Sequence, residues 1–271
     1  MIKHIIYLNI WLSFLAGFLC FSFSSYIGVK SIQSFYLGTT VLFATLFIYS
    51  VHRLYRMENV EEYSKKNKWL NQRENLLKTI VVISFFMATI LYFFFIFQLK
   101  SFFLLVFLGL ISFFYSRKSK VFNKPLRELP TLKIHLIAIT WTVVCFVWPI
   151  IFSEKELINY AKEILVGYTF MVSITIPFDI RDLKFDKIEQ KTIPQIVGVN
   201  GAKIIATVVL LGSLSIILTI EREIVNNFFT YITYGGLALL IFFTAEKRKE
   251  FFYSALVDGW VLFFSCIWFF S

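Results

Sequence analysis

Charged residues are scarce in this chain of 271 residues, where only 16% are Asp, Glu, Lys or Arg and 58% are hydrophobic. Soluble globular domains carry about 25% charged residues, so this composition would not keep a folded domain in solution. Many of the 34 phenylalanines lie inside long apolar runs such as Leu91–Phe97 and Phe102–Phe107. The composition therefore excludes a soluble enzyme and predicts an all-α protein that crosses a lipid bilayer several times.

Cysteine is also rare, and the three that are present, Cys20, Cys145 and Cys266, each fall within an apolar run. None has the close Cys or His spacing of a zinc site, and three is the wrong number for a closed disulfide framework. The longest polar stretch, Glu58–Lys78, has too few apolar residues to form a core of its own. The whole chain, residues 1–271, is therefore predicted to be a single membrane domain.

Nine apolar runs are long enough to be candidate transmembrane helices, because a bilayer core of about 30 Å needs roughly 20 residues of helix. The fourth and sixth runs are the shortest. The predicted spans are Ile5–Ile27, Ile32–Arg53, Leu77–Gln98, Ser101–Ser116, Ile134–Phe152, Ile164–Ile180, Lys203–Ile220, Asn226–Ala245 and Phe251–Phe270.

The positive charges between these spans predict the orientation, because loops on the cytoplasmic side are enriched in Lys and Arg. With the N-terminus inside, all but five of the 27 lysines and arginines lie on the inner side. The five outer ones are Lys30, Lys100, Lys155, Lys162 and Arg222. We therefore expect an integral protein of a bacterial inner membrane, with its N-terminus cytoplasmic and its C-terminus outside. The net charge of +10 reads as an orientation signal, which leaves no basic domain for nucleic acid.

The first span has an alternative interpretation as a signal peptide, with Lys3 ahead of the apolar run and Ser22-Phe23-Ser24 as a small-residue cleavage site. The run is longer than an ordinary signal core. Cleavage would leave eight spans and keep the other loops on their sides.

An acidic cluster follows the sixth span, on the predicted cytoplasmic side. Asp179, Asp182 and Asp186 are spaced i, i+3 and i+7, which on a helix would place them within about 60° of one another. Three carboxylates on one face repel each other unless cations compensate them, and Mg²⁺ prefers oxygen ligands of this kind. The alternative is a solvated helix end, in which the neighbouring Arg181, Lys184 and Lys187 pair with the three aspartates and nothing binds.

The residues that follow the cluster narrow its interpretation to one kind of motif. Asp-x-x-Asp-x-x-x-Asp followed by Lys191-Thr192-Ile193-Pro194 and Gly198 resembles the second aspartate motif of the UbiA-type intramembrane prenyltransferases. That family has nine helices and two aspartate motifs on cytoplasmic loops after helices two and six. The resemblance implies transfer of a prenyl group from a polyprenyl diphosphate to a lipophilic acceptor. It also implies that the three aspartates hold Mg²⁺ against the diphosphate and that Lys191 lies near its negative charge.

The first aspartate motif of that family, Asn-Asp-x-x-Asp-x-x-x-Asp, is largely missing from this chain. The corresponding segment at the end of span two runs from Ser50 to Glu58, and Glu58 alone keeps a carboxylate. In one interpretation His52, Arg53 and Arg56 meet the phosphate oxygens directly, since guanidinium binds phosphate with two parallel hydrogen bonds. In the other they are anchors at the membrane surface.

Three functions remain open at this stage. The first is a prenyltransferase that acts on an isoprenoid diphosphate with Mg²⁺. The second is a member without catalysis, in which the altered first motif leaves binding of an isoprenoid lipid or of a partner protein. The third is a secondary transporter, indicated only by Asp258 within span nine and by the prolines Pro149 and Pro177. The sequence names neither the acceptor nor the prenyl chain length.

Overall fold

The structure, a computed structural model, describes residues 2–59, 69–118 and 124–271, and of these it describes residues 2, 3 and 56–59 by their backbone alone. The described part is helical throughout and contains no strand. Its longer helices are α1 (Ile2–Tyr7), α2 (Ile10–Tyr26), α3 (Ser31–Asn59), α5 (Glu74–Phe95), α6 (Leu99–Ser116), α7 (Leu132–Thr142), α8 (Trp148–Phe152), α9 (Ala161–Asp182), α10 (Ile193–Ile217), α11 (Arg222–Asn226), α12 (Phe228–Phe242) and α13 (Asp258–Phe269). Short connecting elements are η1 (Leu126–Glu128), η3 (Leu157–Tyr160) and η4 (Ile188–Gln190), whereas η2 (Val143–Val147) and η5 (Phe252–Val257) are π-helical segments within the fifth and ninth spans.

Seven helices in the described residues are long and apolar enough to cross a membrane, and two shorter apolar helices, α2 and α12, accompany them. Each of the nine predicted spans corresponds to one of these segments. The fifth span is a continuous helix from Leu132 to Phe152, with a π-helical segment, η2, between α7 and α8. The protein is therefore an all-α, polytopic integral membrane protein, as the sequence predicts.

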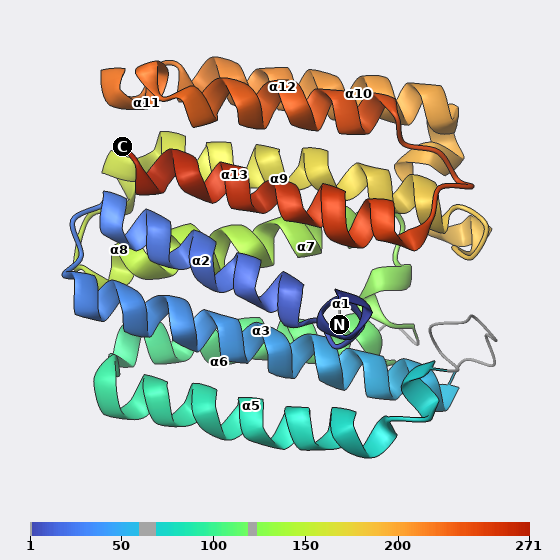
Figure 1. The fold of residues 1–271 in the computed structure, drawn as a ribbon, viewed down its shortest axis with the longest axis horizontal. Helices are drawn as coiled ribbons and strands as arrows, with labels where there is room; N and C mark the ends of the chain where they lie inside the picture. Colours follow the sequence, from blue (N-terminus) through green and yellow to red (C-terminus); the bar gives the residue numbers. More distant parts are fainter. Residues whose placement is uncertain (1, 60–68, 119–123) are drawn as a thin grey trace.

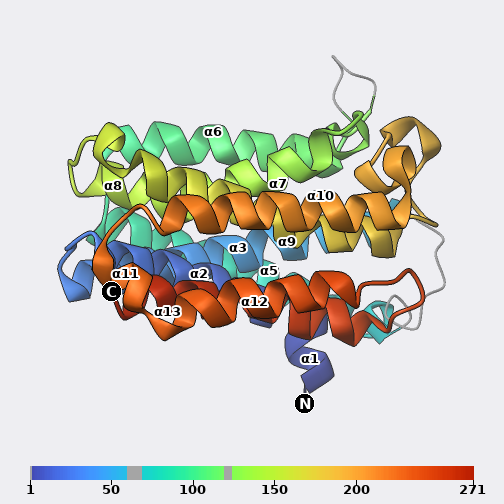
Figure 2. The same ribbon diagram turned by 90° about the horizontal axis from the view of Figure 1, so that it is seen from above.

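The spans lie side by side with their axes along one common direction (Figures 1 and 2). Helix α2 packs against α3 on one side and against α13 on the other, so the first and last spans of the chain are neighbours. The C-terminus lies at one end of the bundle, and the turn between α9 and α10 lies at the opposite end (Figure 1). That second end holds the acidic cluster.

Small and aromatic residues hold the helices together. A Cβ atom added to Gly17 of α2 would lie 2.6 Å from the carbonyl oxygen of Gly38 in α3, so the two backbones touch where only glycine fits. Deeper in the core, the rings of Phe170 in α9 and Phe264 in α13 stack with centroids 3.9 Å apart. Apolar burial gives little driving force between helices in lipid, so close contacts of this kind are what hold the spans in register.

The segment after α9 returns the chain into the bundle. Pro194 lies in the first turn of α10, where a missing N–H costs nothing, and Gly198 interrupts that helix with φ 74°. The backbone N–H of Thr131, just before α7, donates to the carbonyl oxygen of Gln190 in η4 at 3.0 Å. The start of α7 is thereby fixed against the end of the acidic segment.

Candidate active site

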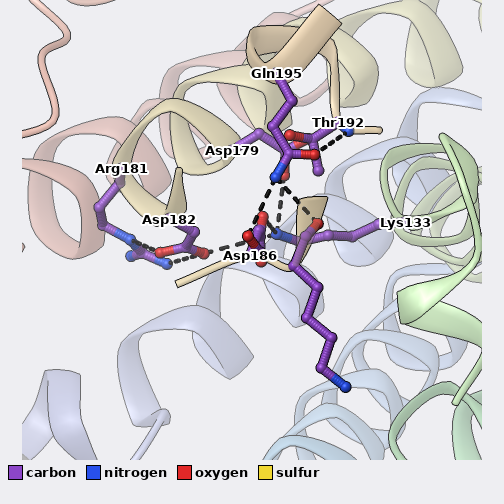
Figure 3. A network of polar contacts seen from close by, with 8 residues as sticks. Lys133, Asp179, Arg181, Asp182, Asp186, Thr192 and Gln195 are labelled. Atoms are coloured by element: carbon purple, nitrogen blue, oxygen red, sulfur yellow. Dashed lines mark hydrogen bonds and ion pairs between the residues drawn. The ribbon is translucent and has the colours of Figure 1, made fainter. Parts of the chain in front are cut away.

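Lys133 stands at the centre of the acidic cluster (Figure 3). Its ammonium Nζ lies 2.9 Å from Asp179 Oδ1, 2.9 Å from Asp186 Oδ2 and 3.8 Å from Asp182 Oδ2. The Asp179 side chain is 1% exposed, and those of Lys133 and Asp186 are 13% and 14% exposed. Three carboxylates from one segment therefore converge on a single cation that α7 supplies.

Only two of the three aspartates lie on helix α9, so the prediction that all three lie on one helix is wrong. Helix α9 ends at Asp182, and Asp186 lies in the turn beyond it. The turn keeps a hydrogen bond from the N–H of Asp186 to the carbonyl oxygen of Asp182, 2.9 Å long, which returns Asp186 to the side of the other two. The Gln195 side chain then donates to the Asp186 carbonyl oxygen at 3.2 Å and holds the turn against α10.

Arg181 forms the second ion pair of the cluster. Its Nε and a terminal nitrogen donate to the two oxygens of Asp182 at 2.7 and 3.0 Å, and its guanidinium carbon lies 4.9 Å from the ring centroid of Phe178. Lys187 pairs instead with Glu128, at 2.8 Å, and Lys184 is exposed. Of the three neighbouring cations that the sequence offers as partners of the aspartates, only Arg181 forms such an ion pair in the described residues, and it does so with Asp182.

Lys191, expected beside the aspartates, is exposed at the end of η4, with φ 44°. The lysine that lies among the aspartates is Lys133, which sequence reasoning missed, and the predicted contact of Lys191 with the diphosphate stays a prediction. The signal was a lysine at the second residue of a helix that contains no other Lys, Arg, Asp or Glu, since a charge at that position is kept only where a partner or water meets it. Nothing in the sequence pairs that lysine with aspartates 46 to 53 residues further on.

The end of α3 lines the same cavity as the acidic cluster and forms its other wall. His52 Nε2 lies 2.7 Å from the carbonyl oxygen of Ser112 in α6. Arg53 donates to the Tyr7 carbonyl oxygen at 3.2 Å and to Asn9 Oδ1 at 3.1 Å, which ties α3 to the junction of α1 and α2. The side chains of Arg56 and Glu58 lie outside the described residues, so their predicted roles stay predictions.

A cavity of about 690 Å³ connects these two walls. His52 and Arg53 line it from α3, and Lys133, Arg181 and Asp182 line it from the acidic side. It continues into the bundle past Trp141 and Met171 to Trp148. This volume is in the range of cavities that enclose an organic ligand, and its polar mouth and apolar depth suit a molecule with a charged head and a hydrocarbon tail.

The charges around the mouth do not cancel. Four cations of the lining face four carboxylates, and Asp179 and Asp186, which bind Lys133, add two more carboxylates. Within this group of side chains the carboxylates exceed the permanent cations by two, before Arg127, which lies beside Asp179 and Lys133, is counted, and a divalent cation would offset the excess. The lining cations are Arg53, Lys133, Arg181 and Arg248, and the lining carboxylates are Asp182, Glu246, Glu250 and Asp258.

The three aspartates suit Mg²⁺, because carboxylate oxygens are the ligands that it prefers and all three point toward the place that the Lys133 ammonium occupies. No group of three His, Cys, Asp or Glu side chains in the described part is arranged to hold a metal as it stands. A metal ion could take this point only if Lys133 Nζ moved away from the carboxylates.

Comparisons with known proteins give no matching family model and no matching curated protein. Solved structures match nearly the whole chain at 13% identity. A UbiA homolog from Archaeoglobus fulgidus bound to GPP and Mg²⁺ covers 98% of this chain and 98% of its own, with a TM-score of 0.66. A second structure of a UbiA homolog from that organism gives 0.61 over the same shares. A digeranylgeranylglyceryl phosphate synthase gives 0.58 over 99% of this chain and 98% of its own. The fold expected from the aspartate motif is confirmed: this chain has the fold of the UbiA-type intramembrane prenyltransferases.

Proposed function

We propose that this protein binds an isoprenoid diphosphate in the cavity and transfers the prenyl group to a lipophilic acceptor. The observation that carries the proposal is the continuity of the cavity from the acidic cluster into the apolar interior. The matching UbiA homolog bound to GPP and Mg²⁺ supports the same class of ligand. The polar mouth receives the diphosphate, and the apolar depth receives the hydrocarbon chain.

Asp179, Asp182 and Asp186 are the proposed metal ligands. Mg²⁺ bound there would neutralise the diphosphate as the allylic C–O bond breaks. Lys133 turns its ammonium from the carboxylates toward the phosphate oxygens, and this motion keeps its charge paired in both states. Arg181 keeps Asp182 oriented through its two hydrogen bonds.

His52 and Arg53 are proposed to face the diphosphate from the α3 wall, where the bonds of Arg53 to Tyr7 and Asn9 fix its position. We keep Lys191, Arg56 and Glu58 as further proposed contacts of the diphosphate. Farther in, rings such as those of Tyr49 and Trp141, joined by a hydrogen bond of 3.3 Å, shield the developing carbocation from water.

A prenyl-transfer assay with purified protein in lipid nanodiscs tests the proposal. Asp182→Asn keeps the shape of the side chain and removes its charge, so we expect turnover to fall at least about a hundredfold, as when one electrostatic partner of a transition state is lost. Glu74→Gln is the matched control, because Glu74 is an exposed carboxylate in the first turn of α5 that pairs only locally with Lys78. Equal turnover of the Asp182 variant and the wild type would refute the assignment.

Binding without transfer is the second candidate, and the cationic α3 wall favours it. His52 and Arg53 stand where the family's first motif carries acidic and amide ligands, so this wall cannot hold a second metal in the same way. If the protein binds isoprenoid diphosphates with Mg²⁺ dependence but releases no diphosphate with any acceptor supplied, this candidate replaces the first.

A further inference from the structure

The apolar part of the cavity is lined by a large side chain of the fifth span, that of Trp148. The lining along the fifth span extends from Lys133 to Trp148 and includes no residue beyond it. Trp148 is 1% exposed, and its ring centroid lies 6.2 Å from that of Tyr92, which is itself buried. The indole therefore lies between the cavity and the outer ends of the helices.

A network of hydrogen bonds fixes the residues behind this indole. The Tyr92 hydroxyl donates to the carbonyl oxygen of Gln98 at 3.0 Å and lies 3.1 Å from the Ser101 hydroxyl. The Gln98 side chain donates to the Phe152 carbonyl oxygen at 2.9 Å. Helices α5, α6 and α8 are thereby joined next to Trp148, and these hydrogen bonds hold the residues around the indole in place.

The depth of the cavity follows from the helix that forms its wall. Lys133 and Trp148 are fifteen residues apart on one nearly continuous helix, which corresponds to roughly 20 Å at about 1.5 Å per residue. An isoprene unit adds four chain bonds of about 1.5 Å in a zigzag, or about 5 Å of length. The cavity therefore has room for about four units beyond the mouth, fewer when the diphosphate takes the first few ångströms.

We propose that Trp148 is the floor of the prenyl site and sets the upper length of the donor at three to four isoprene units. This inference rests on the proposed function and adds the length class of the substrate. Longer chains collide with the indole and with the braced Tyr92 behind it. Shorter chains bind less tightly, because they leave part of the apolar wall without contact.

The test measures affinity for prenyl diphosphates of two to six isoprene units, with Mg²⁺, in nanodiscs. For the wild type we expect affinity to rise up to three or four units and to fall beyond. Trp148→Leu should move the optimum about one unit longer and improve binding of the five-unit diphosphate about tenfold or more, the range that an extra apolar group in a pocket usually gives. Trp268→Leu is the control, because Trp268 is equally buried but packs against Phe23 and Phe146 away from the cavity lining.

Gly109→Phe tests the same idea in the opposite direction. Gly109 lines the cavity from α6 and is exposed, and a Cβ atom there meets nothing within 4 Å, so a larger side chain at this position starts without a clash. We expect this variant to bind the two-unit diphosphate normally and the four-unit one about tenfold more weakly. Equal affinity for all lengths in the wild type, or profiles unchanged in both variants, would overturn the floor while leaving the proposed function standing. No binding of any diphosphate would overturn both.

Discussion

Replacing Lys133 by methionine is the sharpest perturbation of the site, since the change keeps the length of the side chain and removes its charge. Lys133 meets three carboxylates, and two of these, Asp179 and Asp186, are 1% and 14% exposed. Removing one partner of a buried ion pair costs about 3–5 kcal/mol, because the remaining charge is left without compensation. Asp182 is 27% exposed and keeps Arg181, so it adds little.

We therefore expect Lys133→Met to lower the free energy of unfolding by about 3 kcal/mol, the lower end of that range. For a chain of this size that corresponds to a Tm lower by about 6–12 °C. Thermal unfolding in nanodiscs measures it. Lys30→Met is the control, because Lys30 is an exposed lysine between α2 and α3, and its replacement should change stability by less than about 0.5 kcal/mol.

Mg²⁺ supplies the decisive comparison. With Lys133 gone, the convergence point of the three carboxylates is open to a metal, so millimolar Mg²⁺ should raise the Tm of Lys133→Met well above its effect on the wild type. Asp179→Asn combined with Lys133→Met should recover part of the loss, with a coupling of about 1–3 kcal/mol. A variant as stable as the wild type, or an equal Mg²⁺ response in both proteins, would refute the role of Lys133 as the internal cation.

Two further predictions concern the scaffold around the site. Arg53→Gln removes the hydrogen bonds to Tyr7 and Asn9, so we expect faster hydrogen exchange in α1 and a loss of about 1–3 kcal/mol in stability. No change in either measurement would show that these two hydrogen bonds do not hold α1 and α2 against α3. Gly17→Ala brings a Cβ atom within 2.6 Å of the Gly38 carbonyl oxygen, so we expect thermal unfolding to show a loss of about 1–3 kcal/mol in stability. Gly109→Ala is the control, because a Cβ atom at Gly109 lies in open space and should not change stability. Equal Tm values for the two variants would show that α2 and α3 can move apart to accept the methyl group.

The aspartate motif shows which features of the site a short sequence pattern predicts. Its spacing predicted that three carboxylates converge, and they do, although Asp186 arrives by a turn and not by helix periodicity. The loss of the family's first motif left two interpretations of His52 and Arg53, as contacts of the phosphate oxygens or as anchors at the membrane surface. His52 and Arg53 do line the shared cavity, and their contact with a diphosphate stays a prediction.

The sequence by itself determined the all-α membrane fold, because long apolar runs can satisfy their backbone hydrogen bonds in lipid only as helices. It also located the acidic cluster and, through the basic loops, predicted its side of the membrane. Only the tertiary structure decided which cation lies among the aspartates and which side chains line the cavity. Lys133 and the aspartates lie on different helices, as do Trp148 and the Tyr92 that braces it, and such pairs depend on how the helices pack. Packing in lipid arises from close contacts spread over many residues, and no short stretch of sequence records them.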